Sequence, residues 1–312
     1  MKKIPIIMDV DTGIDDAVAI MYAMRSEEID IKGITVVAGN QVLSKTLQNT
    51  LNVVEYFGHP EIPVVMGAAA PLIKEQVIAP EVHGDSGLGR TVLPKASKKP
   101  ELDDAITFLR KTIEESEDKI TLVPVGPLTN IALLFLSYPH VKEKIEKIVM
   151  MGGGAFTGNQ TAAAEFNIWV DPEAAAVVFN SGVPIVMCGL DVTLKSYVDR
   201  FDLDKFKAVG TKAGDFCYEL FDFYLDTFGR KYNKDICAIH DAVTIFYLLH
   251  PEYVTTKKAT VKVDIDGKYT YGCTATDFRP YRPADPNDPL VCMDIDRSKF
   301  VHELLKACES YK

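Results

Sequence analysis

Short apolar runs alternate with longer amphipathic stretches along most of the chain. Residues 4–8 form a β-branched run, a helical pattern follows from about Asp15 to Met24, and residues 31–37 begin a second unit of the same kind. Further strand candidates are residues 120–125, 148–151 and 184–187, and further helix candidates begin after Leu43 and span residues 129–136 and 172–179. Alternation of strands and helices predicts a mostly parallel sheet covered by helices on both faces. We therefore expect an open, Rossmann-like α/β fold.

The pattern changes near the C-terminus. Residues 259–265 and 268–273 flank the pair Asp266-Gly267, which is a strong signal for a two-residue hairpin turn. A strand candidate at residues 291–295 and a helical pattern at residues 297–308 follow. The sequence therefore predicts a small antiparallel hairpin appended to the parallel sheet.

Composition narrows the class of protein. The chain has 312 residues, of which 47% are hydrophobic, and it contains no Pro/Gly/Ser-rich linker or internal repeat. We therefore expect a single domain over residues 1–312, with ample apolar material for a core. The formal net charge of −10 argues against nucleic acid or an anionic membrane surface as a partner, because both attract basic patches.

The cysteines and the apolar runs bear on the compartment. Six cysteines lie far apart without a Cys-x-x-Cys pair, so a zinc knuckle or a redox pair is not expected. The apolar run at residues 4–8 is too short for a signal peptide, and no stretch approaches the roughly 20 apolar residues of a membrane helix. We expect a cytoplasmic protein with free thiols.

Four carboxylates crowd into the loop after the first strand candidate, at Asp9, Asp11, Asp15 and Asp16. In open α/β sheets, ligands bind beyond the carboxyl ends of the strands. A helix N-terminus favours negative charge at Asp15 and Asp16, but the same loop gains repulsion from the other two carboxylates. A bound cation relieves that repulsion, and ligands that are all oxygen select Ca²⁺ or Mg²⁺ over zinc. The loop therefore predicts a site for a hard divalent cation.

Other predicted strand ends could complete this site. Residues 123–130 contain two prolines and a glycine, which fix a tight turn and leave a backbone carbonyl free. His240-Asp241 precedes an apolar helical pattern, where Asp241 could cap the helix, bind a metal, or do both. These segments are consistent with the cation site but do not establish it alone.

A further polar group follows three consecutive glycines at residues 152–154. It consists of Asn159, Glu165 and Asn167, with Phe166 between the last two. Amide and carboxylate ends suit the several hydroxyls of a sugar. The glycine run is only weak support for a phosphate cradle, because it lacks the Gly-Lys-Ser/Thr of a P-loop.

Taken in order, these motifs resemble the inosine–uridine-type nucleoside hydrolases, from residue 4 to about residue 300. The segments that carry the resemblance are residues 9–17, 39–40, 83–85, 123–130, 151–154, 165–174 and 240–241. The resemblance implies a Ca²⁺-dependent hydrolysis of ribonucleosides to ribose and a free nucleobase. It also implies a homodimer or a homotetramer.

The resemblance assigns roles to individual residues. It implies that Asp11, Asp16, Asp241 and the carbonyl of Val125 bind calcium, and that Asp11 also takes a proton from the attacking water. It implies that His240 protonates the leaving nucleobase. It places the ribose or the nucleobase against a larger set, namely Asp15, Asn40, His83, Asn159, Glu165, Phe166 and Asn167, and counts Asn167 with Asp11 and His240 as a candidate catalytic residue.

The nucleobase end of the site is less defined. In the family, the segment that matches residues 223–235 is a mobile flap over the leaving group, and here it is rich in aromatic residues. Tyr232 is the candidate nucleobase contact. For Phe223 and Tyr224, packing into the core is an equally good interpretation.

Two other functions compete with this interpretation. A haloacid dehalogenase-type, Mg²⁺-dependent phosphatase has an Asp-x-Asp nucleophile loop like Asp9-x-Asp11, but it needs a lysine and a later acidic pair, and Asp103-Asp104 follows Pro100 in a predicted loop. A non-catalytic nucleoside- or sugar-binding protein could keep the cation site, but it should have lost the acid–base pair of Asp11 and His240.

Overall fold

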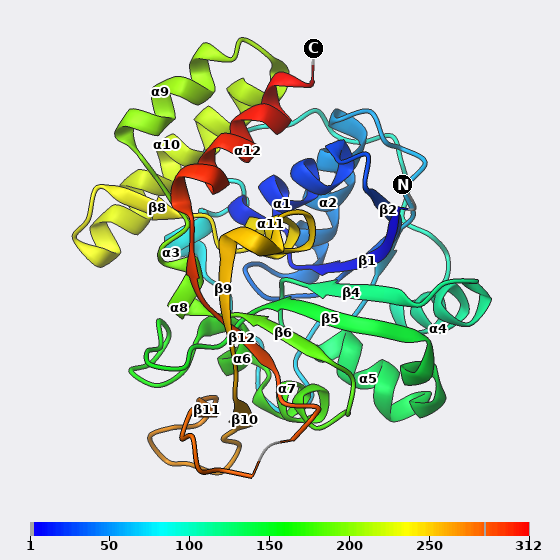
Figure 1. Ribbon diagram of the computed structural model, residues 1–312. Coiled ribbons are helices and arrows are strands. Elements are labelled where there is room, and N and C mark those ends of the chain that lie inside the picture. Colours follow the sequence, from blue (N-terminus) through cyan, green and yellow to red (C-terminus); the bar gives the residue numbers. More distant parts are fainter. Residues whose placement is uncertain (1–2, 284, 312) are drawn as a thin grey trace.

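An eight-stranded sheet forms the centre of the computed structural model, which describes residues 3–283 and 285–311 except for the side chains of residues 231 and 232 (Figure 1). The strand order is β3-β2-β1-β4-β5-β6-β12-β9, and every neighbouring pair is parallel except β12–β9. The strands are β1 (Ile4–Val10), β2 (Ile29–Val36), β3 (Val64–Met66), β4 (Ile120–Pro124), β5 (Ile145–Met151), β6 (Ile185–Cys188), β9 (Val254–Lys258) and β12 (Leu290–Ile295). The predicted mostly parallel α/β sheet is confirmed.

Helices cover both faces of the sheet because the strands alternate their side chains. Ile6, Met8 and Val10 of β1 pack into one apolar cluster with α1, α2, α10, α11 and α12, whereas Ile7 packs into a second with α4, α5 and α7. The longer helices are α1 (Ile14–Arg25), α2 (Leu43–Tyr56), α4 (Ala105–Glu115), α5 (Thr129–Ser137), α7 (Pro172–Phe179), α9 (Arg200–Ala208), α10 (Lys212–Tyr232), α11 (Ala242–Leu249) and α12 (Arg297–Glu309). Among the described residues, no helix is long and apolar enough to cross a membrane.

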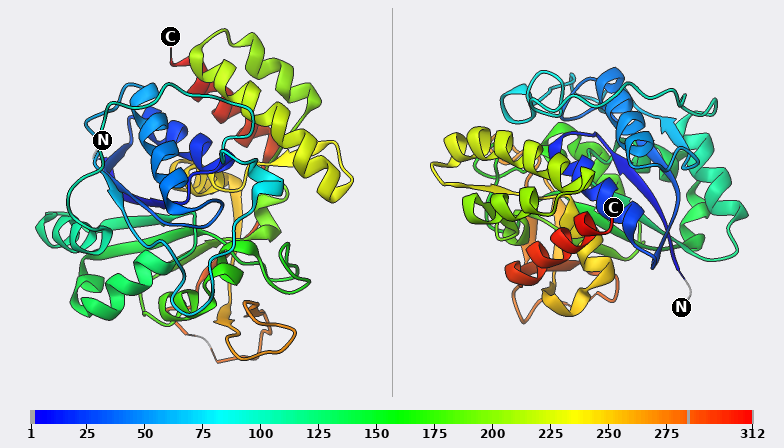
Figure 2. Two further views of the ribbon diagram at one scale, coloured as in Figure 1. Left: turned by 180° about the vertical axis from the view of Figure 1, so that it is seen from behind. Right: turned by 90° about the horizontal axis from the view of Figure 1, so that it is seen from above.

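Several short elements lie around the ends of the sheet. They are α3 (Pro80–His83), α6 (Phe166–Val170), α8 (Leu190–Thr193), the 3₁₀ helices η1 (Pro139–Lys144) and η2 (Pro251–Tyr253), and the paired strands β7 (Tyr197–Asp199) and β8 (Ile236–Ala238). Helix α3 contacts α10, and the two lie side by side when the molecule is seen from behind (Figure 2). The loop that carries His83 is therefore packed against the segment predicted to be a flap.

The antiparallel hairpin near the C-terminus is confirmed as β10 (Thr260–Val263) and β11 (Thr274–Asp277). The prediction of a two-residue turn at Asp266-Gly267 is wrong, because Val263 pairs with Thr274 and residues 264–273 form a wide loop. The carboxylate of Asp264 accepts hydrogen bonds from the backbone N–H groups of Asp266 and Gly267, at 3.1 and 2.7 Å. This side chain organises the loop locally, in place of strand pairing up to the turn.

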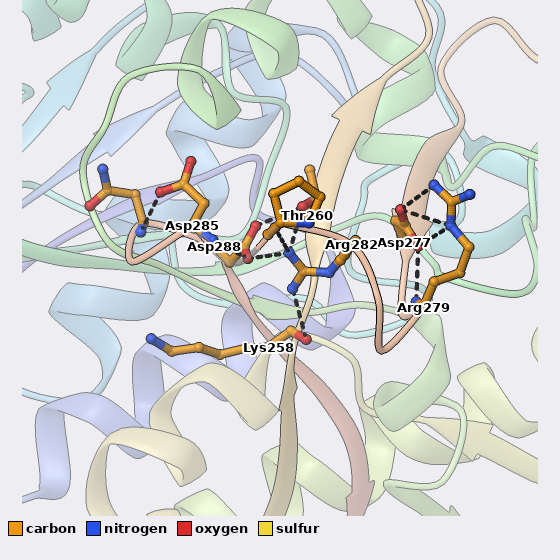
Figure 3. Close-up of polar contacts among 9 residues, drawn as sticks. Lys258, Thr260, Asp277, Arg279, Arg282, Asp285 and Asp288 are labelled. Atoms are coloured by element: carbon orange, nitrogen blue, oxygen red, sulfur yellow. Dashed lines mark hydrogen bonds and ion pairs between the residues drawn. The ribbon is translucent and has the colours of Figure 1, made fainter.

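A small polar cluster holds the chain between β11 and β12 against β10 (Figure 3). The guanidinium of Arg282 donates to the hydroxyl of Thr260 at 2.9 Å and to the carboxylate of Asp288, which also accepts from Thr260 at 2.8 Å. Arg279 pairs with Asp277 in the same region. These contacts are structural: they anchor the return from the hairpin to the central sheet.

Candidate active site

A pocket of about 590 Å³ opens at the carboxyl ends of the parallel strands. Its walls come from loops that follow β1, β2, β4 and β5 and from the short helices α3 and α6. The predicted site residues that line it are Asp15, Asn40, His83, Val125, Asn159, Glu165, Phe166, Asn167, His240 and Asp241. The fold therefore brings together residues that are up to 226 positions apart in sequence, from Asp15 to Asp241.

Asp16 organises the acidic loop. Its carboxylate accepts from the backbone N–H groups of Asp11 and Gly13, at 3.0 and 2.9 Å, so it satisfies two donors at the start of α1. The side chain of Asn40 donates to the same carboxylate at 3.1 Å. These bonds fix the position of Asp16 with or without a bound ion.

Asp11 sits in a space that two glycines keep open. A Cβ atom at Gly39 would lie 2.2 Å from Oδ2 of Asp11, and one at Gly126 would lie 2.8 Å from Oδ1. Oδ2 accepts from the backbone N–H of Asn40 at 2.6 Å, whereas Oδ1 is buried without a hydrogen-bond partner among the described residues. Because a buried carboxylate oxygen without a partner is costly, this atom points to a missing ligand.

The carboxylates are buried close together. Oxygen atoms of Asp15, Asp16 and Asp241 all lie within 4.8 Å of one another. Burial raises the pKa of Asp15 to about 8, and repulsion from Asp16 adds to the shift. Burial likewise raises the pKa of Asp11 and of Asp241, again with repulsion between carboxylates. A divalent cation is the simplest group that lets these carboxylates ionise together.

The three grouped carboxylates differ from the predicted ligand set in one member. The resemblance implies Asp11, Asp16 and Asp241, whereas the tight group contains Asp15 in place of Asp11. Asp11 remains adjacent, because its carboxyl group is within hydrogen-bonding reach of the Asp16 carboxyl group. Oδ1 of Asp11 has no hydrogen-bond partner among the described residues. This atom and the group of Asp15, Asp16 and Asp241 thus lie on neighbouring sides of one acidic site.

Asp241 takes the N-cap position of α11, but its side chain accepts no capping hydrogen bond from the described part of that helix. Instead its carboxyl group is within hydrogen-bonding reach of the Asp16 carboxyl group. Of the roles open to Asp241 from sequence, the local geometry therefore favours ligation over capping.

The carbonyl of Val125 faces the same region. It accepts a hydrogen bond from the side-chain amide of Asn167 at 2.7 Å. A carbonyl oxygen has two lone pairs, so this bond leaves one for a further partner. Asn167 thereby connects the turn after β4 to α6.

Asp9 lies at the end of β1, where the acidic loop begins, and like Asp11 and Asp16 it does not line the pocket. Its carboxylate accepts from the hydroxyl of Thr35 at 3.0 Å and from the amide of Asn130 at 3.3 Å. Burial raises its pKa to about 7 even though both hydrogen bonds lower it. Asp9 thus supports the ends of β1 and β2 from behind the site.

Glu165 lies in the pocket wall together with Asn159, and its carboxylate also accepts hydrogen bonds from the surrounding backbone. The carboxylate of Glu165 caps α6 by accepting from the N–H groups of Asn167 and Ile168, and it accepts from Gly153 at 2.9 Å. Gly154 donates to Thr274. Two N–H groups of the glycine run are therefore used within the protein, which removes the weak support for a phosphate cradle.

Histidine and aromatic side chains form the other end of the pocket. Nδ1 of His83 accepts from the backbone N–H of Ile14 at 3.2 Å. The rings of Tyr224 and Phe228, one turn apart on α10, lie 6.0 Å from His83 and His240 respectively. Tyr224 is buried, as packing into the core requires, and it also lines the pocket. The spacing of four residues on a helix is the sequence signal that could have identified the pair.

Phe223 and Tyr232 differ from Tyr224. The Phe223 ring packs against Gly89, where an added Cβ atom would lie 2.5 Å away, and does not line the pocket. The side chain of Tyr232 lies outside the described residues. Pocket-lining residues that sequence reasoning did not assign are Ala79, Glu81, Val82, Met151, Gln160 and Phe228.

The acidic pair required by the phosphatase interpretation serves other purposes. The carboxylate of Asp104 caps α4 by accepting from the N–H groups of Ile106 and Thr107. Asp103 pairs with Lys111 at 2.8 Å. Neither carboxylate lines the pocket, so no feature of the site favours that function.

Comparison with known proteins agrees with this geometry. A family described as inosine-uridine preferring nucleoside hydrolase matches residues 6–302, which include every candidate site residue. The chain is 44% identical over 314 aligned residues to the pyrimidine-specific ribonucleoside hydrolase RihA of Salmonella agona (strain SL483), and the alignment covers 99% of each chain. Two solved structures also resemble it over 98% of each chain. They are a purine-preferring ribonucleoside hydrolase from Gardnerella vaginalis, with a TM-score of 0.92 and 33% identity, and a plant nucleoside hydrolase, with a TM-score of 0.92 and 32% identity.

Proposed function

Because the chain belongs to the inosine–uridine preferring nucleoside hydrolase family, we propose that its acidic pocket hydrolyses the N-glycosidic bond of ribonucleosides with a bound Ca²⁺ ion and releases ribose and a free nucleobase. The observation that carries this proposal is that Asp15 and Asp241, two members of the buried group of three carboxylates, line one pocket together with the imidazole of His240. The carboxylates suit the ribose and the cation, and the imidazole suits the departing base.

The cation ligands are Asp11, Asp16, Asp241 and the backbone carbonyl of Val125. The orphaned Oδ1 of Asp11 and the free lone pair of the carbonyl fit a hard cation that takes only oxygen ligands. A Ca²⁺ ion held by these residues would lower the pKa of a nearby water molecule and would attract the oxygen atoms of the ribose. Asp15, which is grouped with Asp16 and Asp241, contacts the ribose. Its negative charge also neutralises part of the positive charge of the cation.

Asp11 is the general base. Its Oδ2 is fixed by the backbone N–H of Asn40, and Oδ1 has two lone pairs, so one can face the cation while the other accepts a proton from the attacking water. Breaking the N-glycosidic bond develops positive charge on the ribose, and a pocket lined with carboxylates stabilises that charge electrostatically. The residues that hold the ribose are Asp15, Asn40, Asn159, Glu165 and Asn167, with Phe166 beside them.

His240 is the general acid that protonates the departing nucleobase. A histidine with an ordinary pKa near ~6.5 carries a transferable proton near neutral pH. Base and acid then act from opposite sides of the scissile bond, as in an inverting glycosidase. His83, Tyr224 and Phe228 line the nucleobase end with it, and Tyr232 is a further candidate contact.

The test of this function is ribose release. Reducing sugar is measured after incubation with inosine, uridine, cytidine and adenosine at saturating Ca²⁺. We expect release from at least one nucleoside, and the order of the four rates ranks purines against pyrimidines. Binding of all four without release, or release of phosphate from phosphoesters alone, contradicts the proposed reaction.

Replacing His240 with alanine separates the acid role from binding. We expect a loss in kcat of ~100-fold or more with uridine or inosine, because a poor leaving group needs a proton. With p-nitrophenyl riboside, whose leaving group departs without protonation, we expect a loss of less than about tenfold. Steady-state kinetics on both substrates measures the difference. Equal losses on the two substrates remove His240 from the acid role.

A further inference from the structure

The turn that follows β6 holds the imidazole of His240. Oγ1 of Thr193, the last residue of α8, lies 2.8 Å from Nδ1 of His240. Thr193 is fully buried and does not line the pocket. Its hydroxyl has no other hydrogen-bond partner among the described residues. Because the Thr193 hydroxyl contacts only Nδ1 of His240 among the described residues, its role concerns the His240 ring.

Backbone hydrogen bonds place this hydroxyl from both directions. The N–H of Thr193 donates to the carbonyl of Gly189 at 3.0 Å, and the N–H of Leu190 donates to Gly153 at 2.8 Å, which ties the turn to the end of β5. The N–H of Ile239 donates to the carbonyl of Ser196 at 2.9 Å. The residue before His240 is thus tied to the turn that carries Thr193.

The side chain of Thr193 is also held. Threonine is β-branched, so its χ1 rotation is restricted. The hydroxyl of Ser196 donates to the carbonyl of Thr193 at 2.8 Å, which closes the turn. The backbone N–H of His240 donates to the carboxylate of Asp15, so the main chain of His240 is fixed to the acidic site as well. With the main chain fixed, the remaining freedom of His240 is the rotation of its ring.

We propose that Thr193 is a positioning residue that sets the orientation of the His240 ring through Nδ1, so that Nε2 delivers the proton to the nucleobase. Nδ1 carries a proton both before and after Nε2 gives its own proton away, so the hydroxyl oxygen of Thr193 accepts the same hydrogen bond in both states. When Nε2 gives its proton to the nucleobase nitrogen, the electrons of the broken C–N bond stay with the nucleobase. The ring keeps the proton on Nδ1, and the hydroxyl oxygen of Thr193 accepts a hydrogen bond from that N–H.

This inference rests on the proposed acid role of His240, and its test uses two matched variants. Thr193→Val removes the hydroxyl and keeps the shape, whereas Thr193→Ser keeps the hydroxyl. We expect Thr193→Val to lower kcat for uridine or inosine by ~10- to 100-fold with KM changed by less than about threefold, because a misdirected acid affects the chemical step. Thr193→Ser should retain kcat within about threefold, and p-nitrophenyl riboside should be hydrolysed by both variants at close to the original rate.

A double variant shows whether Thr193 acts through His240. In the His240→Ala background, Thr193→Val should add less than a twofold loss, because the ring that it positions is gone. An equal loss on both substrates, no rescue by serine, or an additive loss in the double variant overturns the inference. If Thr193→Val does not fold, Thr193→Ala is compared with Thr193→Ser under the same criteria.

The two proposals fail in different ways. If His240→Ala loses activity equally on poor and activated leaving groups, the acid role itself is wrong. If His240→Ala behaves as expected and Thr193→Val matches the unmodified protein, only the positioning role of Thr193 is wrong.

Discussion

Replacing Asp11 with asparagine should lower kcat by ~1,000-fold or more while leaving the fold intact. The change removes a negative charge and the proton-accepting oxygen but hardly changes the volume of the side chain. Oδ2 of Asp11 accepts the backbone N–H of Asn40, and the asparagine carbonyl oxygen can keep that bond. The amide nitrogen then replaces Oδ1, the oxygen without a partner.

The size of the effect follows from two losses that occur together. General base catalysis contributes about 10²–10⁴-fold, and one less carboxylate also weakens the electrostatic stabilisation of positive charge on the ribose. kcat is measured at saturating Ca²⁺, so that weaker cation binding is separated from slower chemistry. A loss below about tenfold, or ~1.4 kcal/mol in the barrier, means that Asp11 is not the base.

Asp9→Asn is the matched control. It makes the same chemical change two residues away in the same loop, at a carboxylate that is equally buried but bound to Thr35 and Asn130 behind the site. We expect this variant to keep kcat within about tenfold. Equal losses at Asp9 and Asp11 indicate that the loop responds to any change of charge, which contradicts a specific role for Asp11.

The contrast between Asp9 and Asp11 also shows what the sequence could and could not predict. The apolar periodicity and the position of the loop after the first strand were enough to predict where a ligand binds, since parallel strands end at one edge of a sheet. Of the four carboxylates only Asp15 lines the pocket, and the pairing of β1 with β2 and β4 brings Thr35 and Asn130 against Asp9. That pairing cannot be seen in the loop itself.

Residues from distant helices were harder to predict. Tyr224 and Phe228 line the pocket because α10 packs beside α3, and Thr193 reaches His240 because α8 follows the end of β6. Each of these residues has an ordinary local interpretation as a core or helix-end residue, and tertiary packing decides which of them lie near the pocket. The prediction of a two-residue hairpin turn was wrong for the opposite reason. The local preference of Asp266-Gly267 for a tight turn was outweighed by the hydrogen bonds that their backbone N–H groups donate to the carboxylate of Asp264.

Removal of the cation should abolish turnover and make the free energy of unfolding fall as pH rises. With a chelator present, we expect ribose release to fall to background and to return on addition of excess Ca²⁺. Without a cation, burial and mutual repulsion raise the pKa of Asp15 to about 8 and raise the pKa of Asp11 and Asp241. An aspartate in the unfolded chain has a pKa near ~3.9, so between about pH 4 and 8 the folded, cation-free protein binds more protons than the unfolded chain.

The sign of the effect follows from this difference in bound protons. Because unfolding releases protons in that window, the free energy of unfolding of the chelated protein falls as pH rises, by up to ~1.4 kcal/mol per pH unit for each such carboxylate. Bound Ca²⁺ holds the carboxylates in their ionised form, so the Ca²⁺-saturated protein should not lose stability over the same range. Thermal unfolding at pH 5.5, 6.5 and 7.5, with chelator and with Ca²⁺, measures both slopes. Parallel curves with and without Ca²⁺, or full turnover in chelator, mean that the acidic cluster binds no cation needed for the reaction.

Mg²⁺ in place of Ca²⁺ provides the comparison of metals. A site of several carboxylates and a backbone carbonyl suits Ca²⁺, which is larger and has flexible coordination, better than Mg²⁺, which demands near-octahedral geometry.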